Sequence, residues 1–179
     1  MKKIEIGGIT LKNRFIQAPL AGFTSKAMRK LAYECGASLT YTEMISATAI
    51  YYKNKKTMEM LPSKKEDGLL ALQLFGGEID KVKYAIEKVE DVAEYDFLDF
   101  NLGCPVPKVL KQHAGSYWLK REDELYELFK TMVDYSHHPV IIKSRLGYDN
   151  NHINILDVIK IARSAGIKAV AIHGRTRAQ

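Results

Sequence analysis

The sequence is poor in cysteine, with two in 179 residues, and it contains no Cys-x-x-Cys pair. This argues against a structural zinc site and against a disulfide framework. No apolar run approaches the length that a membrane-spanning helix needs, and no secretory signal pattern opens the chain. We therefore expect a cytoplasmic protein that has neither a metal nor a membrane partner.

Low-complexity linkers are also absent, so the chain is expected to form one domain. Its formal net charge is +6, which permits a polyanionic partner such as nucleic acid. The basic residues gather in two clusters, although either cluster could be an ordinary solvated surface. These are Lys53, Lys55, Lys56, Lys64 and Lys65, and then Lys108, Lys111, Lys120 and Arg121.

Short apolar segments alternate with helical patterns along the whole chain. Strands are predicted at residues 14–18, 38–42, 69–74, 96–101, 140–143 and 168–173. Helices are predicted at residues 25–35, 46–52, 79–92, 123–135 and 153–165. About six such units, with nearly continuous apolar strands, indicate an α/β protein with a parallel sheet covered by helices.

Polar residues recur where the predicted strands end: Gln17, Glu43, Gln73, Asn101, Lys143 and His173. Functional side chains at successive strand ends favour a TIM (β/α)8-type barrel. A doubly wound sheet is the competing architecture, but no G-x-G-x-x-G opens the first helix. A complete barrel has about 250 residues. We therefore interpret residues 1–179 as the N-terminal part of a longer catalytic barrel.

The segment from Asp99 to Pro105 reads Asp-Phe-Asn-Leu-Gly-Cys-Pro. A strand ends at Asn101, Gly103 permits a tight turn, and Pro105 stiffens the exit, so Cys104 is presented from a strand end. In a barrel this is the catalytic rim. The alternative is that Cys104 is a packed apolar side chain, as we expect for Cys35 in its helical pattern.

Several segments together resemble the signature of the tRNA-dihydrouridine synthases, in the order that family has them. They are Ala18–Thr24, Thr42–Met44, Leu72–Gly76, Asn101–Val109 with Ala114–Ser116, Lys143–Gly147 and His173–Thr176. The resemblance covers essentially the entire chain. It implies an FMN-dependent barrel whose remaining strands and C-terminal, tRNA-binding helical domain are absent from residues 1–179.

The resemblance also implies the reaction, which is reduction of uridine in tRNA to 5,6-dihydrouridine with NADPH as the source of electrons. Hydride would pass from reduced flavin to C6 of the base, and Cys104 would donate a proton to C5. An ordinary thiol has a pKa of about 8.5 and is mostly protonated at neutral pH, so it can act as a general acid.

Residues matching the family's FMN contacts are Pro19, Leu20, Ala21, Gln73, Lys143 and His173. Gln73 would bind the pyrimidine edge of the flavin, since an amide both donates and accepts hydrogen bonds. Lys143 would stabilise the anionic reduced ring, and a charge on an apolar strand needs a partner in any case. Asn101 and Arg145 match groups that hold the target uracil.

Other residues receive no committed role in the site. Glu43 could orient a loop. Tyr117 and Trp118 depart from the small or aliphatic residues that are more usual in the family. We expect these two aromatic residues to pack in the core, although a base-stacking role is the alternative.

Two other functions compete with this interpretation. The chain could belong to another FMN barrel that acts on a pyrimidine-type bond, such as a dihydroorotate dehydrogenase-like protein. It could also be an inactive, truncated RNA-binding fragment. The spacing of Cys104, Lys108 and Gly115 argues against the first alternative.

Overall fold

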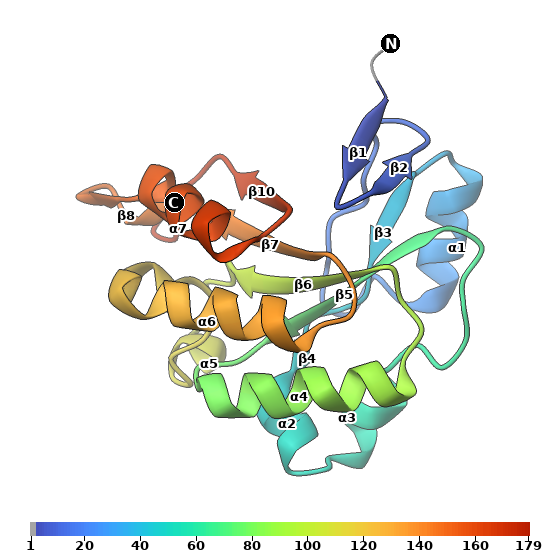
Figure 1. The fold of residues 1–179 in the computed structure, drawn as a ribbon, viewed down its shortest axis with the longest axis horizontal. Helices are drawn as coiled ribbons and strands as arrows, with labels where there is room; N and C mark the ends of the chain where they lie inside the picture. Colours follow the sequence, from blue (N-terminus) through green and yellow to red (C-terminus); the bar gives the residue numbers. More distant parts are fainter. Residues whose placement is uncertain (1–2) are drawn as a thin grey trace.

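The computed structural model describes residues 3–179, and at its centre is a parallel sheet (Figure 1). Its strands lie in the spatial order β10 (Ala169–His173), β7 (Val140–Arg145), β6 (Phe97–Leu102), β5 (Leu69–Phe75) and β3 (Leu39–Tyr41). The short strand β4 (Ile45–Ser46) pairs with the carboxyl end of β5. Every pair in this sheet is parallel, so the predicted parallel sheet is confirmed.

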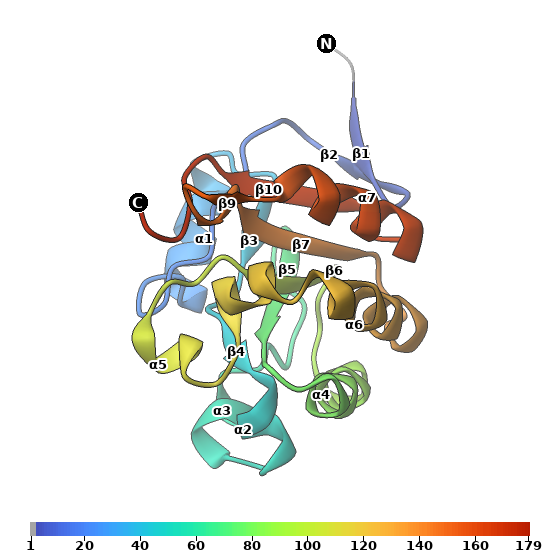
Figure 2. The ribbon, with the colours of Figure 1, turned by 90° about the vertical axis from the view of Figure 1, so that its left-hand side faces the viewer.

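The helices follow the strands in the predicted alternation. They are α1 (Lys26–Glu34), α2 (Ala47–Tyr51), α3 (Lys55–Glu59), α4 (Ile79–Val92), α6 (Glu122–Tyr135) and α7 (Ile155–Ala165). Helix α1 begins after Ser25, whose hydroxyl accepts from the Met28 N–H, and α7 ends at the left-handed Gly166. Seen from the carboxyl ends of the strands, α4, α6 and α7 lie on one side of a curled sheet (Figure 2).

Strand alternation divides the side chains between the two faces of the sheet. In β5, Leu70, Leu72 and Leu74 belong to the large core that lies under the helices. Ala71 belongs to a second, smaller core on the opposite, inner face. A curled parallel sheet with consecutive helices on its outer face is half of a (β/α)8 barrel, which agrees with the predicted partial barrel.

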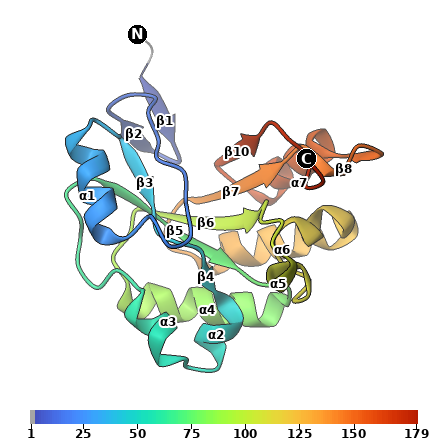
Figure 3. The ribbon, with the colours of Figure 1, turned by 180° about the vertical axis from the view of Figure 1, so that it is seen from behind.

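An antiparallel hairpin that was not predicted, β1 (Ile4–Ile6) and β2 (Ile9–Leu11), lies beside the amino-terminal end of β3 (Figure 3). Leu11 is buried in the inner core, with Ile6 and Ile9 packed against it. The hairpin therefore covers the end of the half-barrel opposite the predicted rim. Other short elements that were not predicted are β4, α3, α5 (Pro107–Leu110), the 3₁₀ helix η1 (Gly115–Lys120), β8 (Gly147–Asp149) and β9 (His152–Ile153).

Two expectations about the first unit were wrong. Residues 14–18 form a single bridge between Ile16 and Leu39 rather than a strand. Two backbone hydrogen bonds flank the bridge, from Gln17 to Leu39 and from Ser38 to Phe15, and the pairing extends no further. Cys35 is exposed instead of packed. It lies at the C-cap of α1, directly before the left-handed Gly36 that leads the chain toward β3. Trp118, by contrast, is fully buried and donates from its indole nitrogen to the Gly76 carbonyl at 2.7 Å, so its predicted core position is confirmed. Tyr117 is only half-buried and its ring stacks on the exposed His113, with 4.6 Å between ring centroids, so the same prediction for Tyr117 was wrong.

Candidate active site

A cavity of about 470 Å³ opens at the carboxyl ends of the strands. Its lining includes every residue that the sequence predicted for the site, together with four others. The complete lining is Ala18, Pro19, Leu20, Ala21, Met44, Gln73, Asn101, Gly103, Cys104, Pro105, Lys143, Arg145 and His173. Residues from six separate segments of the chain thus meet in one place, as the barrel rim requires.

The same alternation that buries the core directs the polar side chains to the inner face. Asn101 follows Phe97, an inner-core residue, at an even spacing along β6, and Lys143 follows inner-core Ile141 along β7. The register of the sheet pairs Asn101 directly with Lys143, and it pairs Gln73 with Asp99. The site is therefore a polar layer above an apolar inner core.

The Cys104 turn is held from both sides. The side-chain oxygen of Asn101 accepts from the N–H groups of Gly103, at 3.0 Å, and Cys104, at 2.8 Å. The carbonyl of Cys104 accepts from the backbone N–H and the hydroxyl of Ser116. Gly115 has a φ of +62°, and a Cβ there would lie 2.7 Å from the Cys104 oxygen. The thiol is consequently presented by a closely packed turn and remains partly exposed.

A chain of side-chain hydrogen bonds runs from the cavity lining to the buried Asp99. Asn101 Nδ2 donates to Gln73 Oε1 at 3.0 Å, and Gln73 Nε2 donates to Asp99 Oδ2 at 2.6 Å. Thr42 adds a fixed point, because its hydroxyl oxygen accepts from the Gln73 backbone N–H. Burial raises the pKa of the Asp99 carboxyl well above its usual value, against the opposing effects of the Gln73 hydrogen bond and the Lys143 charge.

Three basic side chains line the cavity. Burial lowers the pKa of Lys143, the Asp99 charge opposes this, and Arg145 reinforces it. The guanidinium of Arg145 donates to the carbonyls of Gly103, at 2.7 Å, and Thr176, at 2.8 Å. Burial and the nearby cations, Arg145 first, also lower the pKa of His173, which favours a neutral imidazole there. The cavity thus suits an anionic or electron-rich ligand.

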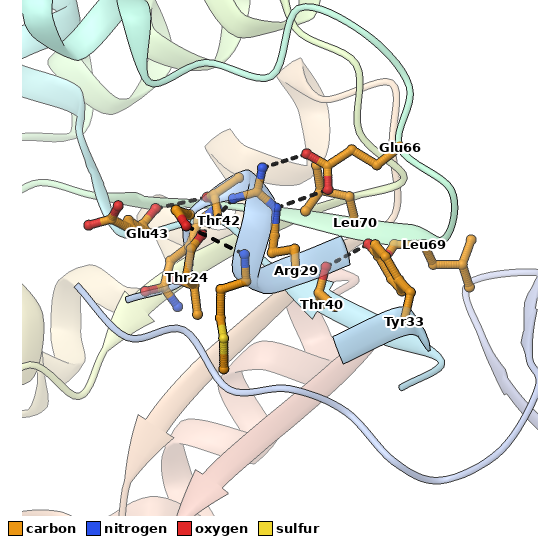
Figure 4. A network of polar contacts seen from close by, with 12 residues as sticks. Thr24, Arg29, Tyr33, Thr40, Thr42, Glu43, Glu66, Leu69 and Leu70 are labelled. Atoms are coloured by element: carbon orange, nitrogen blue, oxygen red, sulfur yellow. Dashed lines mark hydrogen bonds and ion pairs between the residues drawn. The ribbon is translucent and has the colours of Figure 1, made fainter. Parts of the chain in front are cut away.

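The first loop of the cavity wall is anchored by a polar network (Figure 4). Arg29 Nη1 donates to the Thr24 carbonyl at 2.6 Å, and its Nε donates to Glu66 at 3.0 Å. The hydroxyl of Thr24 donates to the carbonyl of Leu20. The carboxylate of Glu43 accepts from the Gly22 N–H, which matches the loop-orienting role that the sequence left open for it.

Sequence reasoning missed Asp99 and Met44. Asp99 is fully buried and lies two residues before Asn101 on the same strand face. A charge inside an apolar strand is the signal that could have identified it. Met44 stands in the Thr42–Met44 segment and lines the cavity, but an apolar side chain after a strand gives no such signal.

The second basic cluster is divided in the structure. Lys108 and Lys111 are exposed on and just after α5, close to the Cys104 turn. Arg121 instead lies over the Trp118 ring, at 4.1 Å, and donates to the Gly77 carbonyl, so its role is structural. Within residues 3–179 no group of histidine, cysteine and acidic side chains could hold a metal ion, and no helix is long and apolar enough to span a membrane.

Comparisons with known proteins identify the family of the chain. The family model for dihydrouridine synthase (Dus) matches residues 16–179. Among curated relatives, tRNA-dihydrouridine synthase B of Vibrio vulnificus is 34% identical over 98% of this chain and 54% of its own length. The enzyme of the same name from Pasteurella multocida is 37% identical over 97% and 52%. A probable tRNA-dihydrouridine synthase of Treponema pallidum is 33% identical over 98% and 53%.

The chain thus spans about half the length of the curated relatives it matches. Among solved structures, mandelate oxidase with (S)-2-phenylpropionate is similar at a TM-score of 0.56 and 15% identity, over 94% of this chain and 49% of that one. At this identity the likeness shows the barrel fold alone. The family match covers nearly the whole chain, including every segment that lines the cavity, and the chain therefore belongs to the dihydrouridine synthase family.

Proposed function

We propose that this chain is the FMN-binding, cysteine-bearing part of an enzyme that reduces uridine in tRNA to 5,6-dihydrouridine. The observation that carries the proposal is the convergence of Cys104, Asn101, Gln73, Lys143 and Arg145 on one cavity at the barrel rim. Membership of the dihydrouridine synthase family, and relatives named tRNA-dihydrouridine synthase, support the choice of reaction.

The residues present fit FMN. One wall of the cavity is apolar, from Ala18 to Ala21 with Met44, and suits the face of a planar aromatic ring. The lining also carries Gln73 and Lys143, which suit a polar ring edge that becomes anionic when reduced. FMN, when bound, supplies the hydride that C6 of the base receives. NADPH is the proposed source of those electrons.

Cys104 is the proposed proton donor to C5 of the base. The two N–H bonds to Asn101 and the Ser116 contacts fix its turn, so the thiol needs little reorganisation to meet a substrate. Arg145 and Asn101 would hold the uracil, since a guanidinium and an amide match its carbonyl oxygens and N–H. His173 would contact the ribityl chain or the phosphate of FMN.

We also propose that the half-barrel is completed by further strands and a helical, tRNA-binding domain. The relatives are about twice as long as this chain. The sheet ends at the Ile16 bridge on one side and at β10 on the other. Neither edge has a further strand partner among residues 3–179. Exposed apolar side chains at these edges support closure there, namely Phe15 and Ile16 at the first edge and Ile172 on β10.

The test is Cys104→Ala in the full-length protein. Loss of a general acid typically lowers a rate by about 10²–10⁴-fold, and we expect tRNA reduction to fall by that factor while FMN stays bound. Cys35→Ala is the matched control, because Cys35 is exposed and remote from the cavity lining. Dihydrouridine formation by the Cys104 variant at the wild-type rate would remove the thiol from the mechanism.

A further inference from the structure

Asp99 is a fully buried carboxyl group that the proposed reaction does not use. It lies on β6 beneath the cavity, and it is not part of the cavity lining. Its Oδ2 accepts from Gln73, whereas its Oδ1 has no hydrogen-bond partner among residues 3–179. Burying a carboxyl group with one unpartnered oxygen is costly, so this position calls for an explanation.

The direction of the hydrogen bonds above Asp99 is fixed from the backbone. The N–H groups of Gly103 and Cys104 can only donate, so the Asn101 atom that faces them is the oxygen. The Asn101 amide nitrogen must then face Gln73, and the Gln73 atom that meets it must be the oxygen. The Gln73 amide nitrogen is left facing Asp99, where it needs an acceptor.

Asp99 supplies that acceptor. Its Oδ2 accepts both in the carboxylate and in the neutral acid that carries its proton on Oδ1, so the chain of bonds has the same direction in either form. The charged and titratable neighbours that act on the group are Lys143 on β7 and Tyr41 on β3. Neither neighbour forms a hydrogen bond with Asp99 in the described part of the chain, where Oδ1 has no partner and the donor to Oδ2 is Gln73.

We propose that Asp99 is a positioning residue that acts on Cys104 through two amides. By accepting from Gln73 it fixes the orientation of Gln73, then of Asn101, and thereby the turn that presents the thiol. Each amide keeps a second N–H, so the cavity floor can still donate to acceptor atoms of a heteroaromatic ligand. The importance of this positioning for catalysis rests on the proposed function, whereas the positioning itself does not.

Hydrogen exchange of the Gly103 and Cys104 amides tests the proposal, in the full-length protein stripped of flavin and without tRNA. Asp99→Leu removes the acceptor, and we expect exchange at both amides to accelerate by about fivefold, the factor for one lost hydrogen bond. Asp99→Asn keeps an acceptor oxygen without the charge, and we expect exchange to stay near the wild-type rate. Gln73→Met removes the middle link and should match Asp99→Leu.

General loss of stability is controlled by Ile86→Val, a packing change on α4 in the outer core. It should accelerate exchange throughout the sheet without singling out the two turn amides. The proposal is overturned if Asp99→Asn accelerates exchange as much as Asp99→Leu, since the charge would then matter rather than the acceptor. It is also overturned if Gln73→Met leaves the two amides protected. Because no arm uses FMN or tRNA, failure of the proposed reaction would leave this result unaffected.

Discussion

Lys143 and Arg145 occupy alternate positions on one strand and face the same cavity, yet their surroundings differ. Lys143 sits beside the buried Asp99, with its ammonium partly desolvated. Arg145 donates to two backbone carbonyls, that of Gly103 in the Cys104 turn and that of Thr176. A desolvated ammonium suits a charge that develops on a bound ring, whereas a guanidinium near the thiol suits a base that enters from outside.

Two substitutions should therefore separate flavin chemistry from RNA chemistry. In the full-length protein, Lys143→Met should impair retention or reduction of FMN, measured by flavin absorbance during NADPH addition. Arg145→Ala should leave NADPH oxidation largely intact but lower tRNA turnover by about tenfold, the factor for one charged hydrogen bond. Loss of flavin in Arg145→Ala, with tRNA turnover restored by added FMN, would reverse the two assignments.

The buried Asp99 should leave a signature in the pH dependence of stability. Its pKa is raised above 3.8 in the folded state, so between 3.8 and the raised value the unfolded chain binds fewer protons than the native one. The free energy of unfolding should then fall as the pH rises through that window. Asn does not titrate, so the variant should not show this fall. In urea unfolding, the free energy of unfolding of Asp99→Asn relative to the wild type should therefore increase as the pH is raised from about 4 to about 7. A pH-independent difference would contradict a buried, titrating Asp99.

At the scale of elements, the first loop depends on one buried ion pair. Arg29 and Glu66 have side chains that are 8% and 5% exposed, and they connect α1 to the segment before β5. Removing one member leaves an uncompensated buried charge, so Arg29→Met should destabilise the protein by about 3–5 kcal/mol in urea unfolding. Removing both, with Arg29→Met and Glu66→Leu, should recover most of that loss.

The exposed pair of Lys160 and Asp157 on α7 is the matched control for this prediction. Its side chains are 76% and 57% exposed. Lys160→Met should change stability by no more than about 0.5 kcal/mol, because water and salt screen such pairs. Equal effects from the two single substitutions would show that burial does not distinguish them.

Elements with a strong local signal could be predicted from the sequence, and the others could not. The apolar run Leu69–Leu74 and the periodic helix 79–92 were predicted with nearly correct bounds, because burial on one face imposes the pattern. The hairpin Ile4–Leu11 was missed because its strands have three residues each and no helix separates them, so they lie outside the alternation of strands and helices. The 3₁₀ helix at Gly115–Lys120 was missed because its position depends on contacts with the Cys104 turn and the Gly76 carbonyl.

The composition of the site was more predictable than its internal connections. Side chains such as Gln73 and Lys143 stand out as polar residues at the ends of apolar strands. Their hydrogen bonds depend on the register between strands, which no single segment encodes. The prediction that Cys35 is packed failed for a related reason. Helical spacing alone does not say which side of α1 faces the sheet, because that depends on the packing of the helix against other elements.

At the scale of the whole molecule, the two open edges of the sheet predict how residues 1–179 behave alone. Phe15 and Ile16 are 69% and 43% exposed at the first edge, and β10 has one strand neighbour among residues 3–179. Such edges favour association. The isolated chain should therefore self-associate, bind FMN poorly and form no dihydrouridine, as judged by light scattering, flavin content and tRNA assay. A monodisperse monomer with stoichiometric FMN would contradict the proposed need for further strands.

The order of the strands in space has a consequence for biosynthesis. β3, β5, β6, β7 and β10 are neighbours in the sheet in the order in which a ribosome makes them. Each strand can therefore pair with one already present, and the chain need not wait for a distant segment. Gln73, Asp99 and Asn101 emerge before Lys143, so the buried carboxyl group can acquire its amide partner before the lysine arrives beside it. The wall of the cavity can thus assemble during translation.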